Sequence, residues 1–304
     1  MAKQKIPSLS YNSMFKAVMK NNPEVLKMYV EEILKYCKSQ IDLSNKNIKI
    51  RENELTLSHH DDKQLICDFI LEVDENTEIN IELNRTRYIG LEERNVTYCF
   101  KIYSEHFKKG DNKKDFKNYH IIQVNFNKFK NINNKRYEEY MLIDSENREY
   151  ILTESLKILN IDIESCYNFV YNNNKDASKL DRLSAMINCD TIEDIDYILG
   201  SEIMSKDNKK NLLENINEIG NSDEIKNSIK LEDTVEEQID YYVRCAAEDA
   251  KEKGIEQGIE QGIEQGIEKG IEKMLKKKMS YDDIMEISGK TLEEIKEIEK
   301  KINN

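Results

Sequence analysis

The sequence predicts an α/β fold in which one mixed sheet is covered by helices. Apolar residues recur at helical spacing over residues 13–37 and again over 91–108. Shorter stretches alternate apolar and polar residues or form dense apolar runs, as strands do, and these are 49–57, 64–73, 78–84 and 119–126. The order α-β-β-β-α-β places a helix between two strands, which favours a mixed sheet.

Local signals divide the first half of the chain into elements. The first helical stretch should break near Asn21–Pro23, because proline cannot continue a helix from its interior. Residues 74–77 read DENT and form a hairpin-type turn between two of the strands. Further strands follow over 137–163 with a turn at Ser145–Asn147, and helical patterning dominates from about residue 164 onward.

These patterns predict four parts of the chain. The first is a core domain with the mixed sheet, followed by extra strands, and the rest is a helical C-terminal extension. The expected boundaries give a core domain at 1–163, a helical region at 164–250, a glycine-repeat helix at 251–278 and a C-terminal helical hairpin at 279–304.

Composition indicates a cytoplasmic protein that does not enter a membrane. The 304 residues are 38% hydrophobic and 35% charged, with no apolar run long enough to span a bilayer. The start MAKQKIPSLS lacks the apolar region of a secretory signal. Six cysteines without a CxxC pair fit reduced thiols, and four histidines without HExxH make a histidine-based metal site improbable.

Charge is distributed unevenly along the chain. The net charge of −13 argues at first against binding to nucleic acid. Residues 1–130, however, carry 22 Lys and Arg against 19 Asp and Glu, whereas residues 131–304 carry 24 against 40. A basic face should therefore lie in the N-terminal half, although solvated surface lysines explain the same charge equally well.

Polar side chains gather on two neighbouring predicted strands. On the strand 78–84, alternation puts three polar residues on one face: Asn80, Glu82 and Asn84. Asp68 lies inside the apolar run of the preceding strand, where a carboxylate is costly unless it is paired, hydrogen-bonded or bound to a metal. The hairpin would bring Asp68 beside Glu82.

Two converging carboxylates repel each other, and a hard divalent cation removes that repulsion. Mg²⁺ takes one or two carboxylates and fills its shell with water and phosphate oxygens. Such an ion activates water and stabilises charge on a phosphoryl group. The alternative is that Asp68 caps a local backbone feature and Glu82 faces solvent.

The motif Asp68…Glu82-Leu83-Asn84 on the second and third strands resembles the PD-(D/E)XK nuclease superfamily, and more narrowly its Rpn-type family of recombination-promoting nucleases and transposases. Further segments are similar to that family and extend the resemblance over nearly the whole chain; they are Met14-Phe15-Lys16, the segment 93–98 with Arg94 and Tyr98, Gly110, the strand 119–126 and the glycine tetrads near the C-terminus. The order and spacing of these segments together indicate the family more specifically than any single segment does.

The resemblance implies a metal-dependent DNA endonuclease that uses Mg²⁺, with Mn²⁺ as a substitute. It implies that Asp68 and Glu82 are metal ligands, with the backbone carbonyl of Leu83 as a third. Asn84 would occupy the superfamily's lysine position, which this family usually fills with Gln, and would orient the attacking water. Asn84 is shorter than Gln, and Asn12 stands where many relatives have an acid, which weakens a second metal site.

Basic residues near this motif are expected to hold the DNA backbone without reading its bases. The expected DNA-binding residues are Arg85, Arg87, Arg94 and Lys101, with a further run at Lys108, Lys109, Lys113 and Lys114. A surface ion pair with Glu92 or Glu93 is the alternative for Arg94. Tyr98 is expected in the core or in the wall of the site.

The C-terminal segments predict contact surfaces rather than chemistry. Ser280 and Thr291 would cap two short helices that resemble a helix-turn-helix, but four Glu against three Lys on the second helix favour a protein-contact hairpin. Residues 252–272 place glycine at every fourth position, at a cost of about 5 kcal/mol relative to alanine. We expect a second helix from another copy to pack there, giving a homo-oligomer through 251–278. A low-complexity spacer with partial helicity is the alternative.

The sequence therefore predicts a Mg²⁺-dependent DNA endonuclease associated with recombination or transposition. One alternative is a catalytically weakened nuclease-fold protein that binds DNA or acts as an oligomerising interaction protein. Another is an oligomerising protein with no role on nucleic acid.

Overall fold

The structure is a computed structural model of the chain and describes residues 3–39, 41, 43, 48–51, 68–106 and 119–303. These residues form two compact units, Met1–Asp240 and Tyr241–Asn304. Several sequence-based expectations lie outside the described residues; they concern 52–57, 64–67, Lys108, Lys109, Gly110, Lys113 and Lys114.

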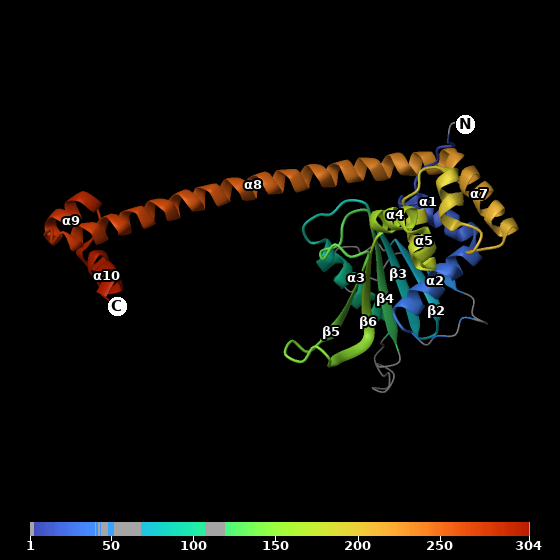
Figure 1. The fold of residues 1–304 in the computed structure, drawn as a ribbon, viewed down its shortest axis with the longest axis horizontal. Helices are drawn as coiled ribbons and strands as arrows, with labels where there is room; N and C mark the ends of the chain where they lie inside the picture. The colour runs from blue at the N-terminus through green and yellow to red at the C-terminus, as the bar shows by residue number, and fades with distance from the viewer. Residues whose placement is uncertain are drawn as a thin grey trace. The chain divides into compact units, whose positions relative to one another are not determined.

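A six-stranded mixed sheet forms the centre of the first unit (Figure 1). Its strand order is β1-β2-β3-β4-β6-β5, with β3 parallel to β4 and β4 parallel to β6, while the other neighbours are antiparallel. The bounds are β1 (Lys49–Arg51), β2 (Phe69–Asp74), β3 (Thr77–Asn84), β4 (His120–Asn127), β5 (Tyr137–Ile143) and β6 (Ile151–Asp162). The predicted α/β fold with a mixed sheet is confirmed.

Helices cover both faces of this sheet. The main core cluster lies on one face and contains α1 (Asn12–Asn21) and α2 (Pro23–Tyr36), which meet at the predicted break because Pro23 begins the second helix. The ring of Phe15 packs edge-on against those of Tyr29 and Phe69. On the opposite face, α3 (Leu91–Glu105) buries Tyr98 and Ile102 in a second cluster with Ile70 of β2.

The alternation of β3 separates its apolar and polar side chains as expected. Ile79 and Ile81 belong to the main cluster beneath α1 and α2. Asn80, Glu82 and Asn84 therefore lie on the other face, toward α3, and all three are nearly inaccessible to solvent. A strand with apolar residues on one face and buried polar residues on the other implies a polar network beneath α3.

The helices that follow the sheet complete the first unit. They are α4 (Ile163–Asn172), the 3₁₀ turn η2 (Asn174–Asp176), α5 (Lys179–Ile187), α6 (Ile192–Leu199) and α7 (Lys206–Asn221). Residues such as Leu183, Ile198 and Ile216 join the same core cluster as the sheet. This helical region therefore shares one core with the strands.

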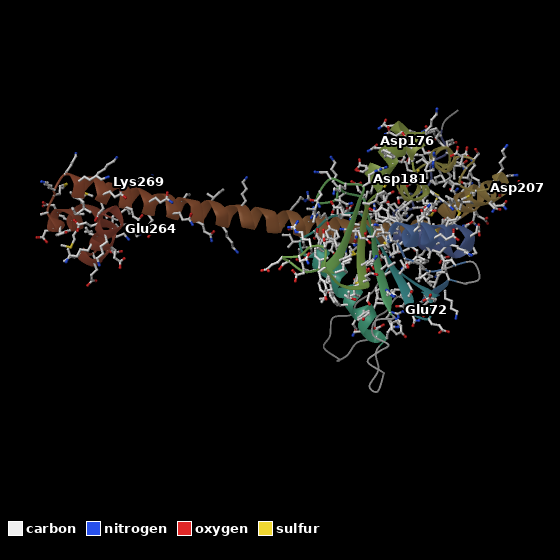
Figure 2. All side chains as sticks on the ribbon, turned by 60° about the horizontal axis from the view of Figure 1, so that its bottom comes forward. Glu72, Asp176, Asp181, Asp207, Glu264 and Lys269 are labelled. Carbon is white, nitrogen blue, oxygen red and sulfur yellow. The ribbon has the colours of Figure 1, made fainter. Side chains whose placement is uncertain are left out.

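Helix α8 (Asp223–Lys276) begins in the first unit and ends in the second. In the second unit, α9 (Tyr281–Ser288) and α10 (Leu292–Asn303) form a small core with the end of α8 around Ile271, Ile284 and Ile295. The Ser280 hydroxyl caps α9 as predicted. Charged side chains such as Glu264 and Lys269 lie exposed on the helix surface of this unit (Figure 2). None of the helices in the described part of the chain has the length and apolarity needed to cross a membrane.

Candidate metal and nucleic-acid site

The β2–β3 hairpin brings Asp68 and Glu82 into contact. Phe69 pairs with Ile81, so Asp68 arrives opposite Glu82 at the end of the ladder. The Asp68 backbone N–H donates to Glu82 Oε1 at 3.0 Å, and the Leu83 backbone N–H donates to Asp68 Oδ2 at 2.9 Å. Asp68 thus does bind the backbone, whereas Glu82 is 1% exposed and does not face solvent.

Both carboxylates sit where negative charge is unfavourable. Burial, together with the nearby charge of Asp68, raises the pKa of Glu82 to about 8. Burial likewise raises the pKa of Asp68. A bound cation would favour the ionised form of both groups, as expected for carboxylates that serve as metal ligands.

The oxygen chemistry of the site fits a hard divalent ion. Asp68 and Glu82 supply carboxylate oxygens, and Leu83 would add its backbone carbonyl, a set that suits Mg²⁺ or Mn²⁺ rather than a soft metal. No group of three or more His, Cys, Asp or Glu placed to hold a metal occurs among the described residues. The site would therefore rely on water and substrate oxygens for the rest of the coordination shell.

Asn12 contacts Asp68 directly. Its Nδ2 donates to Asp68 Oδ1 at 2.5 Å, so both oxygens of Asp68 accept a hydrogen bond. An acid at position 12 would repel Asp68, whereas the amide stabilises its charge. The amide thus holds one predicted ligand in place.

Asn84 is bound on both sides of its amide. Its Oδ1 accepts from Arg94 Nη2 at 2.9 Å, and its Nδ2 donates to Asn127 Oδ1 at 3.0 Å. Arg94 Nη2 also lies 3.5 Å from Glu82 Oε2. Arg94 therefore pairs with Glu82 rather than with the surface acids of its own helix, and Asn84 holds that guanidinium in position.

A pocket of about 350 Å³ opens beside these groups. Of the residues expected to act in the site, it is lined by Asp68, Leu83, Asn84, Arg85 and Arg94. Arg85 Nε and Arg94 Nε are buried donors with no hydrogen-bond partner in the described part of the chain. Two arginine side chains in a pocket wall favour an anionic ligand.

Two of the expected DNA-binding residues lie away from this pocket. Arg87 is half-exposed and pairs with Glu92 at 2.6 Å. Lys101 lies on α3, two turns beyond Arg94, and is not among the lining residues. Tyr98 occupies the core cluster under α3 with its ring 5.4 Å from the Arg94 guanidinium, and it is not among the residues that line the pocket.

Sequence reasoning did not assign Lys16 to the site, although it belongs to the Phe15-Lys16 pair on α1. Burial lowers the pKa of Lys16, while the charges of Asp68 and Glu82 oppose that shift. Its ammonium therefore interacts with both carboxylates. The sequence feature that could have identified Lys16 as a site residue is its position on the helix that faces the hairpin.

An amide ladder supports Glu82 from the side of the sheet. Asn80 Nδ2 donates to Glu82 Oε1 at 3.2 Å and to Gln123 Oε1 at 2.8 Å. Gln123 Nε2 donates in turn to Asn125 Oδ1, and Asn125 Nδ2 to Asn160 Oδ1. The ladder crosses β3, β4 and β6. The register of these strands pairs Asn80 with Gln123 and Asn125 with Asn160, which places their amides side by side.

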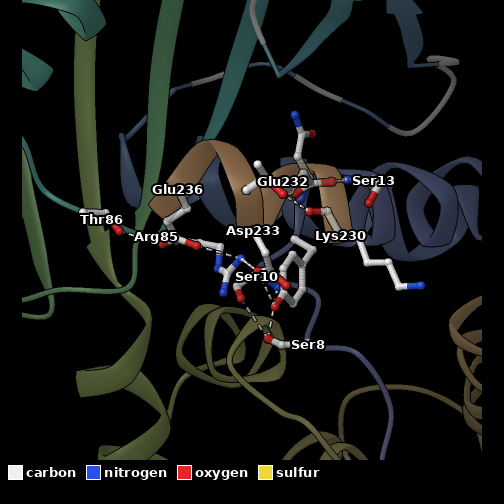
Figure 3. A network of polar contacts seen from close by, with 12 residues as sticks. Ser8, Ser10, Ser13, Arg85, Thr86, Lys230, Glu232, Asp233 and Glu236 are labelled. Atoms are coloured by element: carbon white, nitrogen blue, oxygen red, sulfur yellow. Dashed lines mark hydrogen bonds and ion pairs between the residues drawn. The ribbon is translucent and has the colours of Figure 1, made fainter. Parts of the chain in front are cut away.

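The third and fourth turns of α8 also reach the site, which the sequence did not predict. Glu232 accepts hydrogen bonds from the backbone N–H groups of Asn12 and Ser13 at the start of α1. Arg85 forms ion pairs with Asp233 and Glu236 at 3.0 and 2.8 Å (Figure 3). Both contacts lie at the pocket, since Glu232 and Glu236 are among its lining residues.

Comparison with known proteins gives one family. A search of curated proteins and a search of solved structures found no match. A family model described as "PD-(D/E)XK nuclease family transposase" matches residues 11–224, which include the whole sheet, α1 to α7 and both carboxylates. Because this match spans more than half of the chain, the protein belongs to the PD-(D/E)XK nuclease family of transposases.

Proposed function

We propose that this protein is a divalent-metal-dependent DNA endonuclease, using Mg²⁺ or Mn²⁺, that acts in recombination or transposition. The observation that carries the proposal is the buried pair of Asp68 and Glu82, in which the Asp68 backbone N–H donates to Glu82 Oε1 and both carboxyl groups have a raised pKa. The family supports nuclease chemistry. The pocket beside the pair supports an anionic substrate, because Arg85 and Arg94 line it.

In this proposal Asp68 and Glu82 hold the ion, with the Leu83 carbonyl as a third ligand. A divalent ion supplies an activated water and stabilises charge on a phosphoryl group. Arg94 lies between Glu82 and the pocket, where its guanidinium can bind a phosphate of the substrate. Asn84 positions Arg94 through its Oδ1, and Lys16 offsets the negative charge of the two carboxylates.

The proposal is tested by nicking of supercoiled plasmid with purified full-length protein in Mg²⁺ and in EDTA. We expect nicking in Mg²⁺, none in EDTA, and loss of activity in Asp68→Ala and in Glu82→Ala. Activity that survives either substitution unchanged would remove the assignment of the site.

A specific observation supports a second candidate, a catalytically weakened nuclease-fold protein that binds DNA. Asn84 Oδ1 accepts from Arg94 and Asn84 Nδ2 donates to Asn127, so the amide holds two other side chains and is not free to turn toward a water. DNA binding without cleavage in any divalent ion would favour this candidate over the first.

We also propose that the segment 251–278 joins copies of the protein. Ile255 and Ile259 are 53% and 58% exposed on α8. A Cβ added at Gly258 or at Gly262 would meet no atom of the described chain, so no contact within the chain requires glycine there. A second helix from another copy could use both features, because glycine allows close approach and isoleucine supplies apolar area.

A further inference from the structure

Three acids in the third and fourth turns of α8 contact the rim of the candidate nuclease site. We call Glu232, Asp233 and Glu236 the α8 acidic face. Glu232 binds the N–H groups that open α1, Asp233 accepts from the Tyr11 hydroxyl at 2.9 Å and pairs with Arg85, and Glu236 pairs with Arg85 and accepts from Thr86 Oγ1 at 2.6 Å. All three carboxylates are satisfied by groups outside their own helix (Figure 3).

The groups that these acids occupy are the groups that bind phosphates. Protein contacts to a nucleic-acid backbone come from Arg and Lys, from hydroxyls, and from backbone N–H groups at helix N-termini. The rim offers one of each kind: the Arg85 guanidinium, the Tyr11 and Thr86 hydroxyls, and the first N–H groups of α1. In this structure, carboxylates of the chain itself are bound to these phosphate-binding groups.

The acidic face also alters the electrostatics of the pocket. Glu232 and Glu236 line it together with Asp68. The charge of Glu232 contributes to the raised pKa of Asp68, after the larger effect of burial. A phosphate approaching the two predicted metal ligands would therefore meet additional negative charge while α8 is in place.

Polar contacts hold this part of α8 more than apolar packing does. Leu231 and Val235 lie on the same turns as the acidic face and are 69% and 55% exposed. Apolar anchoring occurs one to two turns earlier, where Ile225 is buried and Ile229 packs against the main core. A segment attached by partly exposed ion pairs separates at low cost, especially at higher salt.

We propose that the α8 acidic face mimics a nucleic-acid backbone and competes with DNA for the Arg85 rim, so that α8 must move aside before DNA can bind. The acids lie beyond residues 11–224, the part matched by the family model, so this contact is added by the chain's own extension. The proposal rests on the proposed DNA substrate, and it concerns access to the site rather than the chemistry there.

The test is the affinity of the full chain for a fluorescent DNA duplex, measured by anisotropy in EDTA so that no cleavage occurs. In the triple variant Glu232→Gln, Asp233→Asn, Glu236→Gln, we expect DNA to bind at least about fivefold more tightly than in the wild type. A matched control removes the same charge from exposed acids that make none of these contacts, in Glu218→Gln, Glu224→Gln, Glu237→Gln. The control should change the affinity by less than about twofold.

Two further measurements separate competition from a loss of folding or of net charge. Because Glu232 caps α1, the double variant Asp233→Asn, Glu236→Gln keeps that cap and should retain most of the gain. Adding Arg85→Ala to the triple variant should remove most of the gain, since Arg85 is the cation that the acids release. Thermal unfolding verifies that each variant is folded.

Equal affinity of the wild type and both neutralised variants would overturn the proposal, as would an equal gain in the matched control. The outcome is independent of cleavage. A protein that binds DNA more tightly without the acidic face but never cuts it supports this inference and contradicts the endonuclease. A protein that cuts DNA with an unchanged affinity in the variants supports the endonuclease and contradicts this inference.

Discussion

Glu82 is the residue on which the chemistry of the candidate site depends most. Its carboxylate is buried, lies next to Asp68, and receives hydrogen bonds from the Asp68 backbone and from Asn80. These donors stabilise the charged form, but burial outweighs them and the pKa rises to about 8. Burial therefore favours the neutral form of Glu82, and a bound cation would favour the charged form.

This shift predicts a pH dependence of the metal-free protein. An unperturbed glutamate has a pKa of 4.5, so the folded chain holds the Glu82 proton more tightly than the unfolded chain does. The stabilisation is complete below pH 4.5 and is lost as the pH rises through about 8. Urea unfolding in EDTA should therefore show the free energy of unfolding falling over this range in the wild type.

Glu82→Gln removes the titrating group and keeps the shape of the side chain. We expect a flatter pH profile of the unfolding free energy in this variant, with the remaining slope coming from Asp68, whose pKa is raised in the same direction. A wild type whose profile matches that of Glu82→Gln would contradict the raised pKa.

The amide ladder gives a second prediction for a single residue. Gln123 is fully buried and both accepts from Asn80 and donates to Asn125, so Gln123→Met removes one hydrogen bond from each of two buried amides, which keep only their bonds to Glu82 and Asn160. The loss should be about 2–4 kcal/mol of unfolding free energy, measured by urea denaturation. A change below about 0.5 kcal/mol would show that the ladder does not stabilise the fold.

At the scale of elements, the strand pattern predicted the site better than any helix did. The period-two alternation of β3 placed Glu82 and Asn84 on one face, and the hairpin placed Asp68 opposite, because both depend on residues close in sequence. Lys16 and Glu232 could not be assigned in this way. Their places follow from how α1 and α8 pack, and Glu232 is far along the chain from the backbone that it binds.

Helix packing in the first unit gives a prediction at this scale. A Cβ at Gly220 of α7 would lie 2.9 Å from Pro7 Cδ and 3.3 Å from Met14 Cε. Because the proline ring cannot move aside easily, Gly220→Ala should destabilise the first unit by about 1–3 kcal/mol in thermal or urea unfolding.

Gly266→Ala is the matched control, since Gly266 is also helical and an added Cβ there meets nothing within the described chain. That substitution should leave the unfolding free energy of the first unit unchanged, because Gly266 lies in the second unit. Similar effects of the two substitutions would show that α7 does not approach the N-terminal segment as described.

At the scale of the whole molecule, the chain consists of two units that α8 connects. The glycine repeat lies in the second unit, where the sequence predicted a helix but could not say what covers it. In the sequence and structure of a single chain, a partner helix is indicated only by apolar residues that the chain itself leaves exposed. Ile255 and Ile259 are such residues on α8.

The proposed oligomer predicts that removing the repeat changes the assembly state. Light scattering should give a multiple of the 35.8 kDa chain mass for the full-length protein and the mass of a single chain for a truncation near residue 250. An unchanged number of copies in the truncated protein would favour the spacer interpretation of the repeat.

The central claim is that Asp68 and Glu82 form a divalent-cation centre at which DNA is cut. The most direct measurement is the rate of plasmid nicking against Mg²⁺ concentration for the wild type, Asp68→Asn and Glu82→Gln. Glu72→Gln serves as the control, because Glu72 lies on β2, four residues after Asp68, and pairs in the sheet with Glu78 rather than with a site residue (Figure 2).

We predict saturable, EDTA-sensitive nicking for the wild type and for Glu72→Gln, and a loss of at least about a hundredfold for each site variant. Nicking by Asp68→Asn or Glu82→Gln at the wild-type rate and with the wild-type Mg²⁺ dependence would contradict the claim.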